Sequence, residues 1–372
     1  MARVEFSVNP EVLTWVISDS DLLPEKMDEQ LQKFEVSGWL RGEKTPTLAQ
    51  LKKFASALHV PFGHLFLKQV PKTQPVSLAF RTVENRPAQM SGGLKKVIGI
   101  MQTRQDWMRD ELIEDGANPL EIIGEYKDES SYQKLAEEVR NLLELNQIEG
   151  IRDTATFFNN LKLKVTQKGI LVMMDGTVGG NTHRPLNTDE ARAFVLIDDY
   201  APLVFLNSKD ALVAKIFSLV HEFVHILRGS DEVLAEERNT NEERFINKVV
   251  ATALIPEKLL LETFSVENVE TNARQFHVSV QTLVYRAKEI GLISQVQVME
   301  ILQNQPEVNA ISGTGGSYWN TAISRVDVRF ADAVMRSNEA GLTPTTEAVS
   351  LLGVSLKTFD GFKNRFFERY AR

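Results

Sequence analysis

The chain has 372 residues, of which 43% are hydrophobic and 25% are charged, a composition typical of a soluble protein with two or three globular domains. It contains no long uncharged apolar run, so we expect no membrane span, and the absence of cysteine excludes disulfides and thiolate metal sites. The net charge of -8 argues against a broad electrostatic attraction to nucleic acid. Because the chain lacks cysteine and its start, MARVEFSVNP, lacks the pattern of a secretory signal, we expect a cytoplasmic protein.

Residues 1–70 are predicted to form a domain of short helices. The residue Thr47 is placed to cap a helix whose apolar residues recur at helical spacing, namely Leu48, Leu51, Phe54, Ala55 and Leu58. The segment resembles the second half of the helix-turn-helix domains of phage-repressor (XRE) type, in which a tryptophan precedes R-G-x-x-x-P-T. The matching residues are Trp39, Arg41, Gly42, Pro46 and Thr47.

The charge of this predicted domain leaves DNA binding open. Residues 1–70 contain eight Lys or Arg and nine Asp or Glu. The expected recognition segment, MDEQLQKFEVSGW, carries three acidic residues, Asp28, Glu29 and Glu35, against Lys33. Because phosphate neutralisation supplies much of the affinity for DNA, this face is poorly suited to a duplex. A protein-docking or vestigial role is the alternative.

Residues 71–150 are predicted to be a linker followed by a helical region. Three prolines mark the linker: Pro71, Pro75 and Pro87. Helical patterns follow at about 93–114 and 132–145.

Residues 151–300 combine strand and helix patterns. The segments LKLKVTQKGILVMMDG and ARAFVLIDDYAPLVFLN are rich in strand-forming residues with turn residues between them, which predicts a small sheet. Two helices are expected next, at 210–228 and 242–253. Residues 301–372 are predicted to be helical after the glycine-rich break SGTGGS. We therefore expect a mainly α fold with a small β-sheet (α+β).

The helix expected at 210–228 contains a pattern typical of a metal site, KIFSLVHEFVHILRG. In a helix, His221 and His225 lie about 40° apart on one face, so both imidazoles can bind one tetrahedral ion. The next residue, Glu222, points about 100° away from His221, where a general base belongs. The alternative is a structural hydrogen-bonded cluster, because a polar trio buried among apolar residues needs partners.

A catalytic zinc also needs a third protein ligand and one open position. In the following helix, Glu243 and Asn247 share a face, so that one can bind the ion while the other accepts a histidine N–H. The competing carboxylates are Glu236, Glu237 and Glu242. Two histidines and a carboxylate suit zinc, with manganese as an alternative.

The chain resembles the ImmA/IrrE family of bacterial and phage metallopeptidases. That family has a strand ending in Asn, then a helix with H-E-x-x-H, then E-x-x-A-N-x-F-A-x-x-L-L-M-P. The corresponding segments are LVFLN at 203–207, HEFVH at 221–225 and EERFINKVVATALIP at 242–256. The segments FRT (Phe80–Thr82) and FHVS…GLIS are similar to those of the longer members. The resemblance implies a zincin-like metallopeptidase core flanked by helical domains, with Glu243 as third ligand and Asn247 in support.

Three residues depart from the family pattern. The chain has Val224 where the family has glycine, Ile246 where it has alanine, and Val249 where it has phenylalanine. These are apolar exchanges at packing positions, so they concern the fit between two helices more than the ligands.

The resemblance implies a zinc-dependent endopeptidase in which Glu222 takes a proton from water and returns it to the leaving amine. A further donor should stabilise the oxyanion. The candidates are His183, Arg192, Tyr200 and Tyr285, and the sequence does not rank them.

Members of that family cut repressor-type regulators in mobile-element or stress control, and longer members are often encoded beside toxins. The resemblance therefore implies a regulatory protein as substrate. The alternative function is a transcription regulator or antitoxin that binds DNA or a toxin and uses the zincin domain as a scaffold. Candidate partners are a repressor-type substrate, a toxin and a second copy of the chain.

Overall fold

The structure is a computed structural model, and the residues that it describes are 6, 8–18, 20, 24–58, 60, 62–70, 79–81, 91–229, 240–305 and 318–370. Several residues named in the sequence predictions lie outside them: Pro71, Pro75, Thr82, Pro87, Glu236, Glu237 and the segment 312–317.

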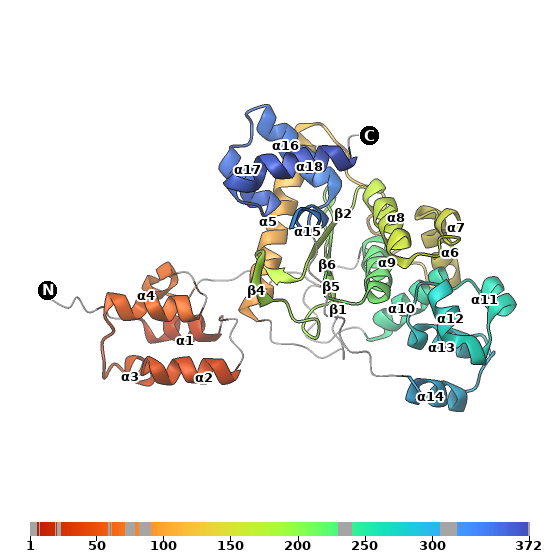
Figure 1. Ribbon diagram of the computed structural model, residues 1–372, viewed down its shortest axis with the longest axis horizontal. Coiled ribbons are helices and arrows are strands. Elements are labelled where there is room, and N and C mark those ends of the chain that lie inside the picture. The colour runs from red at the N-terminus through yellow and green to blue at the C-terminus, as the bar shows by residue number, and fades with distance from the viewer. Residues whose placement is uncertain are drawn as a thin grey trace. The chain divides into compact units, whose positions relative to one another are not determined.

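The chain divides into two compact units, which Figure 1 colours by residue number. The first comprises residues 1–75 with 87–99, and the second comprises 76–86 with 100–372. Each unit is described by itself.

The first unit consists of short helices around an apolar core. Its helices are α1 (Pro10–Ser18), α2 (Pro24–Lys33), α3 (Val36–Leu40), α4 (Leu48–Ala57) and the 3-10 helix η1 (Phe62–Phe66). The rings of Trp39 and Phe34 each lie 5.4 Å from the ring of Phe54, which is fully buried. The hydroxyl of Thr47 accepts from the backbone N–H of Gln50 at 3.3 Å, so the predicted cap of α4 is confirmed. The assignment of this unit to the helix-turn-helix type stays a prediction.

Within the described residues, the second unit contains a four-stranded sheet in the order β1–β5–β6–β2. Its strands are β1 (Ala79–Arg81), β2 (Leu171–Asp175), β5 (Ala193–Leu196) and β6 (Leu203–Asn207). The pair β2–β6 is parallel, and the pairs β1–β5 and β5–β6 are antiparallel. A separate hairpin is formed by β3 (Thr177–Val178) and β4 (Asn181–Pro185). The predicted fold class, mainly α with a small sheet, is confirmed.

Helices make up most of the second unit. They are α5 (Gly92–Glu114, of which residues from Ile100 belong to this unit), α6 (Tyr132–Leu142), α7 (Leu145–Ile148), α8 (Thr154–Gln167), α9 (Leu212–Arg228), α10 (Thr240–Leu254), α11 (Glu257–Thr263), η2 (Val266–Asn268), α12 (Val269–Gln275), α13 (Val280–Glu289), α14 (Gln295–Gln303), α15 (Tyr318–Ser324), α16 (Val328–Glu339), α17 (Thr345–Leu352), η3 (Leu356–Thr358) and α18 (Phe359–Tyr370). No described helix is both long enough and apolar enough to cross a membrane.

One predicted strand is wrong in part, because the first half of LKLKVTQKGILVMMDG is the end of α8 and the strand β2 begins only at Leu171. The alternation L-K-L-K suggests a strand, yet Phe158, Leu161 and Val165 recur at helical spacing and are all buried. The carboxylate of Asp153 also accepts from the backbone N–H of Thr156 at 2.7 Å and begins the helix. The buried apolar face and the N-terminal cap therefore favour a helix more strongly than the short L-K-L-K alternation favours a strand.

The strands β2, β5 and β6 lie in the interior of the second unit, and all of their residues except Asp175 are buried. One set of their side chains, including Val172, Val195 and Val204, joins a large apolar cluster with α8, α9 and α10. Figure 1 shows α8 and α9 beside the sheet. Because β6 leads through a short turn into α9, the sheet positions the helix that carries the histidines.

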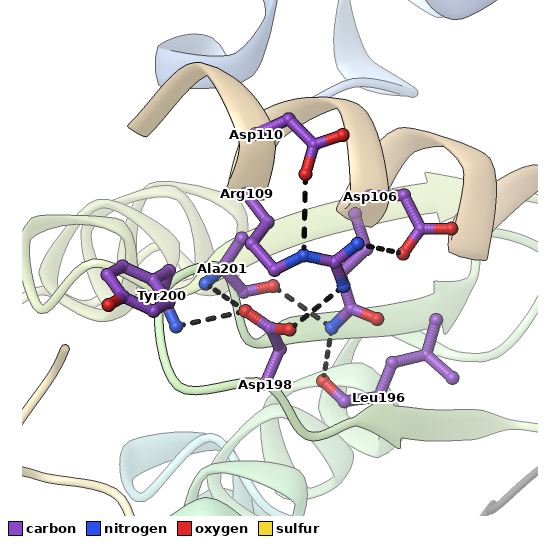
Figure 2. A network of polar contacts seen from close by, with 8 residues as sticks. Asp106, Arg109, Asp110, Leu196, Asp198, Tyr200 and Ala201 are labelled. Atoms are coloured by element: carbon purple, nitrogen blue, oxygen red, sulfur yellow. Dashed lines mark hydrogen bonds and ion pairs between the residues drawn. The ribbon is translucent and has the colours of Figure 1, made fainter. Parts of the chain in front are cut away.

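A polar network ties α5 to the turn between β5 and β6 (Figure 2). The buried amide of Gln105 donates to two main-chain carbonyls of this turn at 2.9 and 3.0 Å. A guanidinium N–H of Arg109 donates to Asp198 at 3.2 Å, and Asp198 also accepts from the backbone N–H groups of Tyr200 and Ala201 at 2.9 and 2.8 Å. The network therefore fixes the turn that leads into β6. Tyr200, one of the predicted oxyanion donors, lies in this turn.

A fully buried carboxylate, that of Asp327, joins α16 to α8 and β2. It accepts from the hydroxyl of Thr166 at 2.8 Å and from the backbone N–H of Val172 at 3.1 Å. It also accepts from the N–H groups of Arg329 and Phe330 in the first turn of α16, at 2.9 and 3.3 Å.

We expect Asp327→Ala to lower the free energy of unfolding by about 3 kcal/mol, because buried donors on three elements lose their acceptor. The measurement is the midpoint of urea unfolding, followed by near-UV circular dichroism. The matched control is Asp360→Ala, which removes an exposed carboxylate from the first turn of α18. Equal midpoints for the two variants would show that the network contributes nothing specific.

Candidate metal centre

The helix α9 is buried along most of its length, since every residue from Ile216 to Leu227 is buried. The three positions that depart from the family pattern, Val224, Ile246 and Val249, are fully buried and belong to the same apolar cluster. These side chains therefore fit within the packed core that contains α9 and α10.

The C-terminal end of α9 packs closely against the loop that precedes α6. The helix ends at Gly229, which has a φ of 57° and whose added Cβ would lie 2.8 Å from the Cα of Gly124. The backbone N–H groups of Gly124 and Tyr126 donate to the carbonyls of Ile226 and Leu227, both at 2.9 Å. Glycine is thus required at 229 both by the positive φ and by the close approach of Gly124. The N–H groups of the loop satisfy two of the last carbonyls of the helix.

Three potential ligands converge between α9 and α10. The Nε2 atoms of His221 and His225 lie 3.1 Å apart, and the two carboxylate oxygens of Glu243 lie 3.4 and 3.3 Å from them. In the described part of the chain this is the one group of three such side chains placed to hold a metal ion. A tetrahedral ion with bonds of about 2.0–2.1 Å holds its ligand atoms about 3.3–3.4 Å apart. The residues therefore fit a divalent ion with three protein ligands.

The charge state of Glu243 suits a ligand. Burial raises the pKa of this carboxyl, but hydrogen bonds and charge interactions with His221 and His225 outweigh burial and hold the pKa well below its usual range. The carboxyl is therefore ionised at neutral pH, which is the state that metal binding requires.

The predicted base, Glu222, is 1% exposed and lies on α9 directly after His221. The carboxylate of Glu222 does not belong to the converging group, which consists of His221, His225 and Glu243. The helical spacing predicts such a separation, because Glu222 follows His221 by about 100° around the helix while His221 and His225 share one face. Its role as base stays a prediction.

The competing carboxylate Glu242 is engaged elsewhere. Its two oxygens accept from Nε and Nη2 of Arg228 at 2.7 and 3.1 Å. The third nitrogen of Arg228, Nη1, donates to the carbonyls of Tyr126 and Glu129 at 3.0 and 2.7 Å. Because Arg228 follows His225 by one turn and Glu242 precedes Glu243, this two-bond pair sets the register of the two helices that carry the ligands.

We expect Arg228→Met to weaken zinc binding on the order of tenfold, because residues that support metal ligands commonly contribute this much to affinity. Methionine keeps much of the length of the side chain and removes its donors. The measurement is competition with a chromophoric chelator. As a control, Arg274→Met removes a guanidinium that is 79% exposed on α12 and should leave the affinity unchanged. Unchanged affinity in both variants would rule out this positioning role.

A groove of about 890 Å³ lies between α9, α10 and α13, and the three ligands themselves are not among its lining residues. It includes Phe217, one turn before His221 on α9, and the two rings lie 6.4 Å apart. It also includes Asn247, one turn after Glu243 on α10, and the side-chain amide of Asn247 forms no hydrogen bond within the described residues. The support that Asn247 is predicted to give a histidine therefore stays a prediction.

Two of the predicted oxyanion donors line this groove, namely Arg192 and Tyr285. The other two do not: Tyr200 lies in the turn drawn in Figure 2, and His183 lies exposed on β4. Sequence reasoning missed the groove and the role of Arg228, because the residues involved come from separate elements and carry no local pattern.

Residues 165–288 match the family model of the IrrE N-terminal-like domain, Peptidase_M78. No curated protein and no solved structure matches the chain. The matched range contains the three converging ligands, Glu222 and most of the groove. This part of the chain is thus similar to a metallopeptidase domain, and its His–His–Glu group could bind a metal ion. The helix-turn-helix resemblance of residues 1–70 stays a prediction.

Proposed function

We propose that the chain is a metal-dependent endopeptidase whose site is formed by His221, His225, Glu243 and Glu222. The observation that supports it most is the convergence of three ligand side chains, whose nitrogen and oxygen atoms lie 3.1, 3.3 and 3.4 Å apart, on the two helices that also line a groove of about 890 Å³. The match of residues 165–288 to a peptidase family supports the same activity.

In this proposal the side chains of the protein have three tasks: they hold the ion, they keep the ligands in place and they transfer a proton. The imidazoles of His221 and His225 and the ionised Glu243 carboxylate hold the ion, and α9 and α10 fix them through buried apolar residues. When bound, a divalent ion polarises a peptide carbonyl and lowers the pKa of water toward about 7. The carboxylate of Glu222 accepts the proton of the attacking water and donates it to the leaving amine.

We propose zinc as the ion, with manganese as the alternative, because neutral imidazole and carboxylate ligands in a tetrahedral arrangement suit zinc. We propose a repressor-type regulatory protein as the substrate, because the chain resembles the ImmA/IrrE family, whose members cut such proteins. The acidic surface of the segment 27–39 supports a protein-docking role for the first unit, which would recruit that substrate.

The experiment that tests the activity uses a library of peptides derived from a bacterial proteome. The full chain, loaded with zinc, is incubated with the library, and new peptide ends are identified by mass spectrometry. The expected result is a defined set of cleavages that 1,10-phenanthroline stops and added zinc restores. Absence of any zinc-dependent cleavage, either in the library or in intact repressor-type proteins, would contradict the proposal.

A further inference from the structure

The groove beside the metal centre differs in charge from the rest of the chain. The whole chain has a net charge of -8. The groove, in contrast, is lined by basic side chains with a single acidic one among them, Glu289. The basic residues are Arg192, Arg244, Lys248, Arg286 and Lys288. This concentration of positive charge is local, and the groove lies along α9 and α10, the two helices that carry the three potential ligands.

Part of this positive charge is balanced inside the protein. The guanidinium of Arg286, which is 3% exposed, lies 2.7 Å from the Glu289 carboxylate. The ammonium of Lys248 lies 3.9 Å from the same carboxylate, and Nε of Arg192 lies 3.9 Å from Asp210. One carboxylate therefore serves both Arg286 and Lys248.

Two basic residues of the groove have no carboxylate partner within the described part of the chain. The guanidinium of the exposed Arg244 forms no hydrogen bond or ion pair there, and the ammonium of the exposed Lys288 donates to the neutral amide of Gln295. Both line the groove, Arg244 on α10 directly after Glu243 and Lys288 near the end of α13. Their charges are thus available to a ligand.

The side of the groove nearest the histidines is apolar. It is formed on α9 by Val213, Ala214 and Phe217, the last of which is one turn before His221. A ligand that fits this arrangement places an apolar residue on α9 and negative charges against α10 and α13. A polypeptide with these side chains meets both requirements. A single-stranded nucleic acid is less suitable, because stacking of bases needs exposed aromatic rings and Tyr285 is the exposed aromatic residue of the lining.

We infer that the groove binds an acidic segment of the polypeptide substrate and that Arg244 and Lys288 select it. This inference rests on the proposed endopeptidase function and specifies the class of its substrate. The two residues act on specificity and not on bond cleavage, because opposite charges steer and orient a ligand at a partly exposed surface.

The test is a binding measurement that requires no turnover. The probe is a fluorescein-labelled peptide in which glutamates follow a leucine–alanine pair, beside the same peptide with glutamine in place of every glutamate. Binding is followed by fluorescence anisotropy on the full, zinc-loaded chain carrying Glu222→Gln, so that neither peptide is cut. We expect the glutamate peptide to bind at least tenfold more tightly than the glutamine peptide, and added salt to reduce the difference.

Charge reversal then locates the site. The double variant Arg244→Glu and Lys288→Glu should lose the tenfold preference and keep the affinity for the glutamine peptide. The matched control, Lys134→Glu and Lys357→Glu, changes the net charge equally at exposed positions outside the groove and should keep the preference. Equal binding of the two peptides, or equal loss in both double variants, would overturn the inference. So would tighter binding of a labelled single-stranded DNA that only the Arg244 and Lys288 variant loses.

Failure of this inference and failure of the proposed function give different results. Cleavage of both peptides by the wild-type chain at equal kcat/KM would overturn the charge selection and leave the endopeptidase function standing. Selective binding of the glutamate peptide, with no peptide or protein ever cut, would support the groove as an acidic-peptide site and contradict the endopeptidase function.

Discussion

Replacement of Glu222 by glutamine is expected to leave one zinc ion bound per chain and to lower kcat for peptide cleavage by about 10²–10⁴-fold. Glutamine has nearly the same size as glutamate, but its amide cannot accept the proton of the attacking water. Because Glu222 is not among the three converging side chains, its exchange should leave the metal site intact. The measurements are zinc content by mass spectrometry and kcat on a peptide identified from the library.

The matched control for this variant is Glu257→Gln, which changes an exposed carboxylate in the first turn of α11. It should retain both zinc and kcat. Cleavage by Glu222→Gln at the wild-type rate would show that this carboxylate is not the base, and loss of zinc from the same variant would show that it acts on the metal site.

Replacement of His221 by alanine is expected to abolish both zinc retention and cleavage. One of three converging ligands is removed, and the remaining two, His225 and Glu243, cannot hold a catalytic ion against dialysis. A second expected effect is thermal. At a free zinc concentration 100 times the Kd, binding stabilises the folded state by about 2.7 kcal/mol, so a chelator should lower the Tm of the wild type and not that of the variant.

The control for the histidine variant is His183→Ala, which changes an exposed histidine on β4. This chain should keep its zinc and the effect of chelator on its Tm. Full zinc content in His221→Ala after dialysis would place the ion elsewhere in the protein.

The core of the site could be predicted from local spacing. The four-residue separation of His221 and His225 places both imidazoles on one face of a helix whatever the fold, and the structure brings their Nε2 atoms to 3.1 Å. The third ligand was not determined by the residues alone. The buried face of α10 is wide and includes Ile246, Val249 and Val250, so the helical phase does not distinguish Glu242 from Glu243.

Contacts between distant segments account for what the sequence did not predict. The pair of Arg228 with Glu242 joins residues of two different helices, and it is this pair that removes Glu242 from the set of candidate ligands. The strand β1 has only three residues, which is too short for the alternating pattern of a strand to be visible in the sequence. It pairs with β5, more than a hundred positions later in the chain. The groove likewise combines residues from Arg192 to Glu289.

The central claim is that His221, His225 and Glu243 together hold one divalent ion, and X-ray absorption at the zinc edge tests it most directly. For the zinc-loaded full chain, the account predicts a four-coordinate ion with two imidazole nitrogens and oxygen ligands at about 2.0–2.1 Å. A spectrum without imidazole scattering, or a chain that binds no ion at all, would contradict the account.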